Sequence, residues 1–135
     1  MRESNGARLA RFGAVTPKVS VVIPVLNEER HLAEVVQRAL RQDFAGELEV
    51  VIAVGPSSDR TEAIAAELAA ADSRVHWVPN PSGRTPDAMN AGLAAATGDV
   101  IVRCDGHALL PQDYVRIAVE TLARTGAANV GGVMD

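Results

Sequence analysis

Four short apolar runs recur along this chain, and the stretch between each pair is long enough for one helix. This alternation limits the possible folds more than any other feature. The runs cover residues 19–23, 48–54, 75–78 and 100–104, and Val and Ile dominate the first two. Continuous runs of this kind are typical of strands that are buried on both faces. Such an alternation predicts an α/β fold: a mostly parallel sheet with right-handed crossovers and with helices on both faces.

The segments between the strands have helical patterns. After the first strand, apolar residues recur at helical spacing and form one stripe, made of Leu32, Val35, Val36, Ala39 and Leu40. The residues expected to cap the first three helices are Asn27 for the first, Ser58 or Asp59 for the second (residues 61–71), and Thr85 for the third. Gly98 is expected to end the third helix.

A fourth helix is expected to begin at Pro111 and to end at Gly126. Residues from 129 onward have the pattern of another strand, and the chain stops there. We therefore expect the domain to be incomplete at its C-terminus. Residues 1–16 contain no continuous apolar segment and are expected to form a flexible leader.

Composition excludes several classes of function. The chain has 135 residues, a length that suits one domain, and its formal net charge is −4. Its basic residues are scattered, apart from three arginines in the leader, so a nucleic-acid partner is not expected. No run of about 18 apolar residues is present, so no membrane span is expected. The one cysteine, Cys104, excludes an internal disulfide, fits a reducing compartment, and is expected to be a buried core residue.

An acid, a glycine and a histidine directly follow the fourth strand. Asp105 and His107 are two residues apart at the end of a buried strand, where both could face one divalent cation. Alone, such a turn is more often a capped loop than a metal site. In an open α/β sheet, however, the loops after the strands share one edge, and three of the four here lead toward helix N-termini, which favour anions. The sequence therefore predicts a site for a phosphorylated ligand and a metal at this edge.

Four stretches along the chain resemble the nucleotide-sugar half of family 2 glycosyltransferases with the GT-A (Rossmann-like) fold. They are residues 19–29, 57–61, 90–99 and 105–107. The resemblance runs from about residue 19 to the end of the chain, and it implies that residues 17–135 are the nucleotide-sugar-binding part of such a domain. The Arg-Thr-Pro and Asp-Gly-His-Ala elements are most similar to bacterial exopolysaccharide transferases of the succinoglycan-biosynthesis type.

The resemblance implies roles for individual residues. The residues implied to bind the nucleotide-sugar are Pro24, Val25, Asn27, Glu28, Gly55, Arg84 and Asp105. Asp105 matches the first acid of the family's Asp-x-Asp motif, which meets the ribose and the metal-bound diphosphate, so it is the implied catalytic residue. His107 stands where the family usually has the second Asp, and we expect it to bind the metal together with Asp105. The implied cofactor is Mn²⁺ or Mg²⁺, and a neutral imidazole ligand favours Mn²⁺.

The chain departs from the family pattern at the end of the second strand. The family usually has an acid there that accepts a hydrogen bond from uracil, whereas this chain has Val54. An aliphatic side chain accepts no hydrogen bond, so the base of the donor stays open.

The implied activity is that of a glycosyltransferase of the hexosyltransferase type. It would transfer a sugar from a nucleotide-sugar donor to a saccharide or lipid-linked acceptor, with inversion, in polysaccharide or cell-envelope biosynthesis. The expected location is the cytoplasm, at the inner face of the plasma membrane if the parent protein is membrane-associated. Inversion needs a general base, which the resemblance places beyond Asp135.

Two other functions stay open. One is a truncated, non-catalytic module that binds a nucleotide or a partner, which the missing base-reading acid favours. The other is a nucleotidyltransferase of related fold, which is disfavoured because no Gly-rich loop follows the first strand. The same absence disfavours P-loop nucleotide triphosphatases and dinucleotide oxidoreductases.

Overall fold

A computed structural model of the chain describes residues 16–125. In this part of the chain, strands and helices alternate as β1 (Val19–Val25), α2 (Leu32–Leu40), β2 (Leu48–Val54), α3 (Thr61–Ala71), β3 (Val75–Pro79), α4 (Thr85–Ala95), β4 (Val100–Arg103) and α5 (Tyr114–Thr125). The sheet order is β3-β2-β1-β4, and every neighbouring pair is parallel. The predicted α/β class is therefore confirmed, whereas the leader before Thr16 and the strand expected from residue 129 lie outside the described residues.

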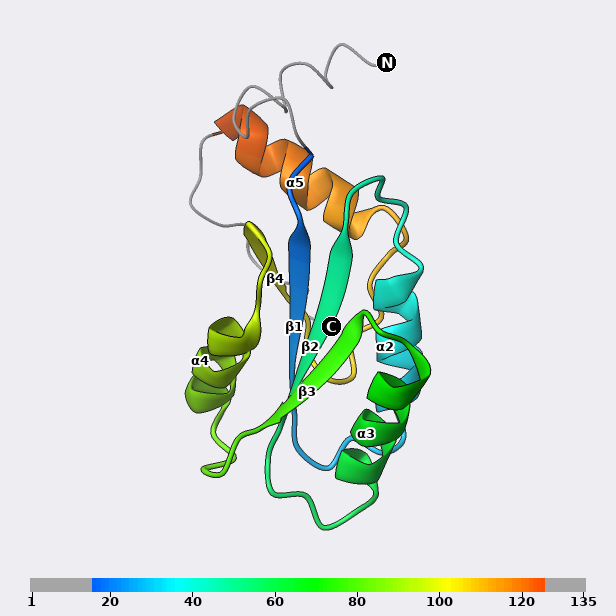
Figure 1. The fold of residues 1–135 in the computed structure, drawn as a ribbon, viewed down its shortest axis with the longest axis vertical. Coiled ribbons are helices and arrows are strands. Elements are labelled where there is room, and N and C mark those ends of the chain that lie inside the picture. Colours follow the sequence, from blue (N-terminus) through cyan, green and yellow to red (C-terminus); the bar gives the residue numbers. More distant parts are fainter. Residues whose placement is uncertain (1–15, 126–135) are drawn as a thin grey trace.

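Helices cover both faces of the sheet, as predicted. Figure 1 shows α4 on one side of the strands and α2 and α3 on the other. Alternate residues of β1 serve the two faces: Val21 and Ile23 belong to the core cluster formed with α2, α3 and α5, whereas Val22 meets Gly92 of α4. A Cβ atom at Gly92 would overlap Val22 Cγ1, so glycine lets α4 lie directly on the sheet.

Four of the five residues in the stripe predicted for α2 are fully buried, and the fifth, Leu40, is half-buried against the core. Leu32, Val35, Val36 and Ala39 are all fully buried, and charged residues of the same helix face solvent. β1 is longer than predicted, because it continues through Pro24 to Val25. Pro24 pairs with Ala53 of β2, but it lies beyond Val22, the last residue of β1 that pairs with β4, so β1 has no second neighbouring strand there.

The predicted N-caps are wrong in detail. The residue before α2 is His31, because Asn27 lies in the preceding loop with φ 54° and bonds a different loop. The residue before α3 is Arg60, although Asp59 accepts the N–H of Thr61, the first helical residue, at 2.9 Å. Thr85 lies inside α4, since Arg84 occupies the capping position and makes no side-chain bond there.

Two predicted helix ends also differ. α4 ends at Ala95. Gly98 packs against the backbone of β1 instead, where a Cβ atom would lie 2.7 Å from the backbone nitrogen of Ser20. α5 begins at Tyr114, because Pro111 forms a preceding turn in which its carbonyl accepts the Tyr114 N–H at 3.0 Å. None of the helices between residues 16 and 125 is long and apolar enough to cross a bilayer.

A buried carboxylate joins the amino ends of β1 and β2 to the loop after α4. Glu49 accepts hydrogen bonds from the Ser20 hydroxyl at 2.6 Å and from the Thr97 N–H at 2.7 Å. Lys18 and His76 place nitrogen atoms 3.8 and 3.5 Å from its other oxygen. Burial alone would raise the pKa of Glu49, but these hydrogen bonds and the Lys18 charge outweigh it and lower the pKa. The carboxylate is therefore held in its charged form in the folded chain.

Candidate functional site

The loops after β1 and β2 are bound to each other by a row of hydrogen bonds at the carboxyl edge of the sheet, at the lower end of Figure 1. The donors and acceptors are Asn27 N to Ser57 Oγ (3.0 Å), Ser58 N to Asn27 Oδ1 (2.8 Å), Glu28 N to Thr61 Oγ1 (2.8 Å), Glu29 N to Asp59 Oδ2 (3.2 Å) and Arg60 N to Glu29 Oε1 (2.9 Å). Backbone amides of both loops are thereby satisfied, and the two loops form one unit. Hydrogen bonds from Thr61 lower the pKa of Asp59 despite partial burial.

The loop after β3 packs against this unit through a buried asparagine and two glycines. Asn80 donates its backbone N–H to the Val54 carbonyl at 2.7 Å and its side-chain Nδ2 to the Arg84 carbonyl at 3.1 Å. Gly83 has a φ of 73°, which suits glycine, and its Cα would lie 3.2 Å from a Cβ at Gly55. The close approach at Gly55 therefore explains why a glycine follows Val54.

The turn after β4 closes the other side of the site. Gly106 lies so close to β1 and its loop that a Cβ would stand 2.8 Å from Val25 Cγ1 and 3.0 Å from Glu28 Cγ. Cys104 is fully buried beside this turn, and burial, with the nearby charge of Asp105, raises the pKa of its thiol to about 12. The cysteine is thus a core residue, as predicted, and its thiol stays neutral.

These loops enclose a cavity of about 210 Å³ at the carboxyl edge of the sheet. It is lined by Pro24, Val25, Leu26, Glu28, Asn80, Gly83, Thr85, Ala88, Arg103, Asp105, Gly106 and His107. Five of the sequence-predicted site residues are therefore brought together, from segments that lie far apart in the chain: Pro24, Val25, Glu28, Asp105 and His107.

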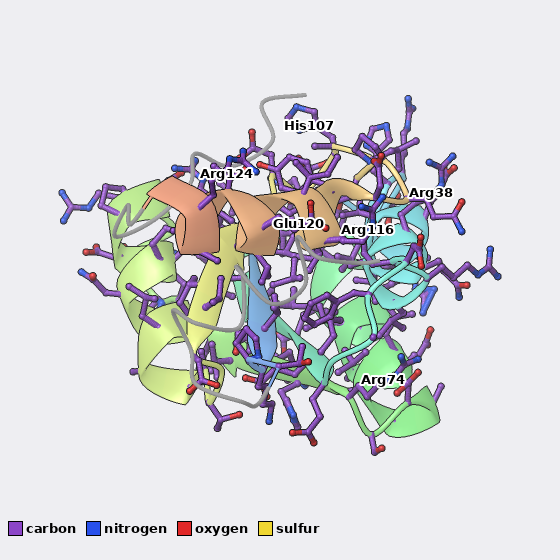
Figure 2. The ribbon with its side chains drawn as sticks, turned by 90° about the horizontal axis from the view of Figure 1, so that it is seen from above. Arg38, Arg74, His107, Arg116, Glu120 and Arg124 are labelled. Carbon is purple, nitrogen blue, oxygen red and sulfur yellow. The ribbon has the colours of Figure 1, made fainter. Side chains whose placement is uncertain are left out.

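The polar side chains in and beside the cavity contact one another. The Glu28 carboxylate has His31 Nδ1 at 3.3 Å from one oxygen and His107 Nδ1 at 3.4 Å from the other. The two imidazole rings meet edge to face with centroids 6.5 Å apart. Asp105 has Arg103 Nη2 at 3.3 Å. His107 is half exposed and projects from the loop after β4 in Figure 2, so a ligand can reach it.

Three predicted residues do not line the cavity. Asn27 holds the loop after β2, and Gly55 provides the close approach to Gly83. The Arg84 side chain is exposed, and its guanidinium pairs with Asp87 at 3.2 Å. Val54, at the position where the resemblance led us to expect an acid, points into the hydrophobic core.

Sequence reasoning missed three polar residues of the cavity, Asn80, Arg103 and Thr85, the last of which was expected only as a helix cap. A signal for Arg103 was present: it is the one charged residue in the fourth apolar run, directly before the Asp-Gly-His turn. Asn80 gave no such signal, because asparagine is a common turn residue and nothing in the sequence indicates that it is buried.

The fit of a divalent ion can be judged from the donors present. No three His, Cys, Asp or Glu side chains within residues 16–125 are arranged around one point in a way that could hold a metal ion. Asp105 and His107 would thus offer at most two donors. Mg²⁺ at phosphate-transfer sites commonly uses one or two carboxylates together with substrate phosphates. The donor set therefore fits an ion that arrives with a diphosphate, and it does not form a closed metal cage.

Comparisons with known proteins agree on one family. Residues 20–135 match the model of glycosyl transferase family 2. The succinoglycan biosynthesis protein ExoA of Rhizobium meliloti is 37% identical over 112 residues, which are 82% of this chain and 34% of that protein. An undecaprenyl-phosphate 4-deoxy-4-formamido-L-arabinose transferase of Pectobacterium carotovorum is 32% identical over 78% of this chain and 34% of its own length. The chain thus spans about a third of the length of these relatives.

Solved structures share the fold. The mannosyltransferase PcManGT of Pyrobaculum calidifontis, in complex with GDP-Man and Mn²⁺, is 25% identical with a TM-score of 0.70, over 89% of this chain and 43% of its own. Residues 1–349 of Staphylococcus aureus TarS, in complex with UDP, are also 25% identical with a TM-score of 0.68, over 78% of this chain and 32% of that one. These neighbours are GT-A glycosyltransferases, and the predicted GT-A architecture is confirmed.

Proposed function

Because the chain belongs to glycosyltransferase family 2, we propose that it forms the donor-binding part of an enzyme that transfers a sugar from a nucleotide-sugar to a saccharide or lipid-linked acceptor. One observation carries the proposal: residues from the β1 loop (Pro24, Val25, Glu28) and from the β4 turn (Asp105, His107) line the same cavity at the carboxyl edge of the sheet. This edge is where open α/β sheets bind nucleotides.

The donor would lie across this cavity. Pro24 and Val25 offer backbone and apolar surface to the nucleoside, and Glu28, held from both sides by imidazoles, offers an acceptor of fixed orientation. Asp105 and His107 would hold a divalent ion, and Mn²⁺ in complex with the mannosyltransferase neighbour supports that choice of class. When bound, such an ion neutralises the charge that develops on the diphosphate as the sugar–phosphate bond breaks.

Inversion, a polysaccharide or cell-envelope product, and a place at the inner face of the plasma membrane are further parts of the proposal. The relative named as a succinoglycan biosynthesis protein supports the product class. The general base that inversion requires is expected in residues that follow Asp135.

A second candidate is a binding module without turnover. It is favoured by Val54, whose side chain is buried in the core and so reads no base. Under this reading, the cavity would bind a nucleotide without supporting transfer.

Calorimetry can test whether the cavity is a donor site. The 135-residue chain is titrated with UDP, GDP and dTDP, each with Mn²⁺ and with EDTA. We expect one of the three to bind, more tightly with Mn²⁺, and Asp105→Asn to abolish the Mn²⁺ effect. Asp43→Asn removes the same charge from an exposed residue outside the cavity and should bind like wild type.

The possible results separate the candidates. Failure of all three nucleotides to bind at millimolar concentration contradicts the donor site. Binding by this chain, combined with an absence of sugar transfer by the longer parent protein when it is supplied with the matching nucleotide-sugar, favours the module without turnover.

A further inference from the structure

Arg103 is the one arginine in residues 16–125 that lines the cavity. Its place follows from strand register: Arg103 pairs with Val22, and Val22 faces α4 through Gly92. Paired residues in neighbouring strands point to the same face, so the Arg103 side chain leaves the sheet on the α4 side. Thr85 and Ala88 of α4 line the cavity from that side as well.

The guanidinium of Arg103 is only partly satisfied. Nη2 lies 3.3 Å from Asp105 Oδ1, whereas Nε is shielded from solvent and has no hydrogen-bond partner in the described part of the chain. Arginine cannot lose its proton, so this N–H has to donate to something. Buried polar groups without a partner are rare in folded proteins. The rest of the Arg103 side chain, which is 41% exposed as a whole, lies beside the cavity.

Of the other arginines in the loops at this edge, Arg30 is exposed and does not line the cavity, and the remaining two are already paired. Arg60 lies 3.0 Å from Glu67 and Arg84 lies 3.2 Å from Asp87, and both side chains are exposed. Neither lines the cavity. Arg103 therefore has the position and the free donor that an anionic ligand requires.

We propose that Arg103 binds the diphosphate of the donor, with its guanidinium donating to phosphate oxygens. This inference rests on the proposed function, because it takes the ligand of the cavity to be a nucleoside diphosphate derivative. A planar guanidinium suits phosphate oxygens better than other cations do.

A consequence can be measured without activity. Part of the donor affinity comes from the protein's own cation, so nucleoside diphosphate binding persists in weakened form without a divalent ion. The probes are UDP, GDP and inorganic pyrophosphate, titrated into the 135-residue chain in EDTA and in Mn²⁺. Pyrophosphate separates contacts to the diphosphate from contacts to the base.

In EDTA, we expect Arg103→Ala to bind the preferred nucleotide and pyrophosphate about 10- to 100-fold more weakly than wild type, the range for one charge-assisted hydrogen bond. Arg103→Lys keeps the charge but not the planar group, and it should fall between the two. Arg38→Ala is the matched control, because it removes the same charge from α2 (Figure 2), and no residue of α2 lines the cavity. Thermal unfolding verifies that each variant is folded, and the Lys variant carries the test if the Ala variant is not.

Each outcome decides a different point. If Arg103→Ala binds the probes in EDTA as tightly as wild type and loses affinity only in Mn²⁺, the inference is overturned. Arg103 is then a positioning residue for Asp105. Equal losses of affinity in Arg103→Ala and Arg38→Ala also overturn it, because the losses would then come from the change in net charge alone. If wild type binds none of the probes in either buffer, the proposed function itself fails.

Discussion

The Asn27 side chain accepts a hydrogen bond from the backbone N–H of Ser58 at 2.8 Å, across 31 residues of sequence. Asn27 is also the residue with a positive φ, 54°, among the non-glycine residues between 16 and 125. Asparagine tolerates this conformation better than most residues, and its amide oxygen then faces the next loop. One residue therefore sets the path of the β1 loop and attaches the β2 loop to it.

We expect Asn27→Ala to lower the free energy of unfolding by about 1–2 kcal/mol, because it removes the hydrogen bond and leaves alanine with an unfavourable φ. Urea unfolding measures the loss. Asn27→Asp keeps both the acceptor and the tolerance for this φ, so it should lose much less. Equal stability of the two variants would show that the bond to Ser58 contributes nothing.

Gly92 is expected to tolerate no side chain. Alanine usually stabilises a helix relative to glycine by about 1 kcal/mol, but a Cβ here overlaps Val22. Overpacking costs about 1–3 kcal/mol, so Gly92→Ala should destabilise the fold. Val22→Ala in the same chain makes room and should recover part of the loss. A double-mutant cycle measured by denaturant unfolding verifies this, and strictly additive effects would contradict it.

The Cys104 thiol is expected to react slowly. Burial, followed by the Asp105 charge, raises its pKa to about 12, so at pH 8 only about one thiol in ten thousand is ionised. Reaction with Ellman's reagent should be slow in buffer and complete within the mixing time in denaturant, with one thiol per chain. Fast reaction of the folded chain would mean that the turn after β4 opens readily.

Stability is expected to fall in acid through Glu49. Its folded pKa lies below the ordinary value of 4.5, so below that pH the unfolded chain binds more protons than the folded chain. The stabilisation is complete above the unfolded pKa and is lost as the pH falls through the folded pKa. Unfolding free energies measured between pH 7 and pH 3 should therefore decrease toward acid.

Glu49→Gln is the matched test of that pH dependence. It should lower stability at pH 7, because the Ser20 and Thr97 donors lose a charged acceptor, and it should flatten the decrease toward acid. Asp72→Asn should change the pH dependence of stability at lower pH, because hydrogen bonds from Arg74 lower the pKa of Asp72 to about 2. If the free energy of unfolding of Glu49→Gln falls toward acid as steeply as that of wild type, other carboxylates cause the loss of stability.

The alternation of strands and helices was predictable because it follows from local sequence patterns. The Val- and Ile-rich runs and the α2 stripe depend only on near neighbours in sequence. The caps were not predictable from the same information. Asn27 is a good cap residue by type, yet Ser58, which is remote in sequence, decides where its side chain points.

The candidate site was half predictable for a related reason. Chain order and the parallel fold place Glu28 and Asp105 at one edge, whatever the side-chain conformations. Which arginine faces inward depends on detail: Arg84 turns to Asp87, three residues on, a spacing visible in the sequence. Arg103 faces inward because of its register with Val22, which sequence alone does not give.

The central place of β1 has a kinetic consequence. β1 pairs with β2 on one side and with β4 on the other. The contact between β1 and β4 joins residues that are far apart in sequence: the hydrogen bond from Lys18 to Asp99, next to these strands, spans 81 residues. Closing so long a stretch is slow, so we expect β4 to join the sheet after β1, β2 and β3 have formed. The cavity would then be among the last parts of the domain to assemble, and any molecule that contacts both the β1 loop and the β4 turn would hold that final strand in place.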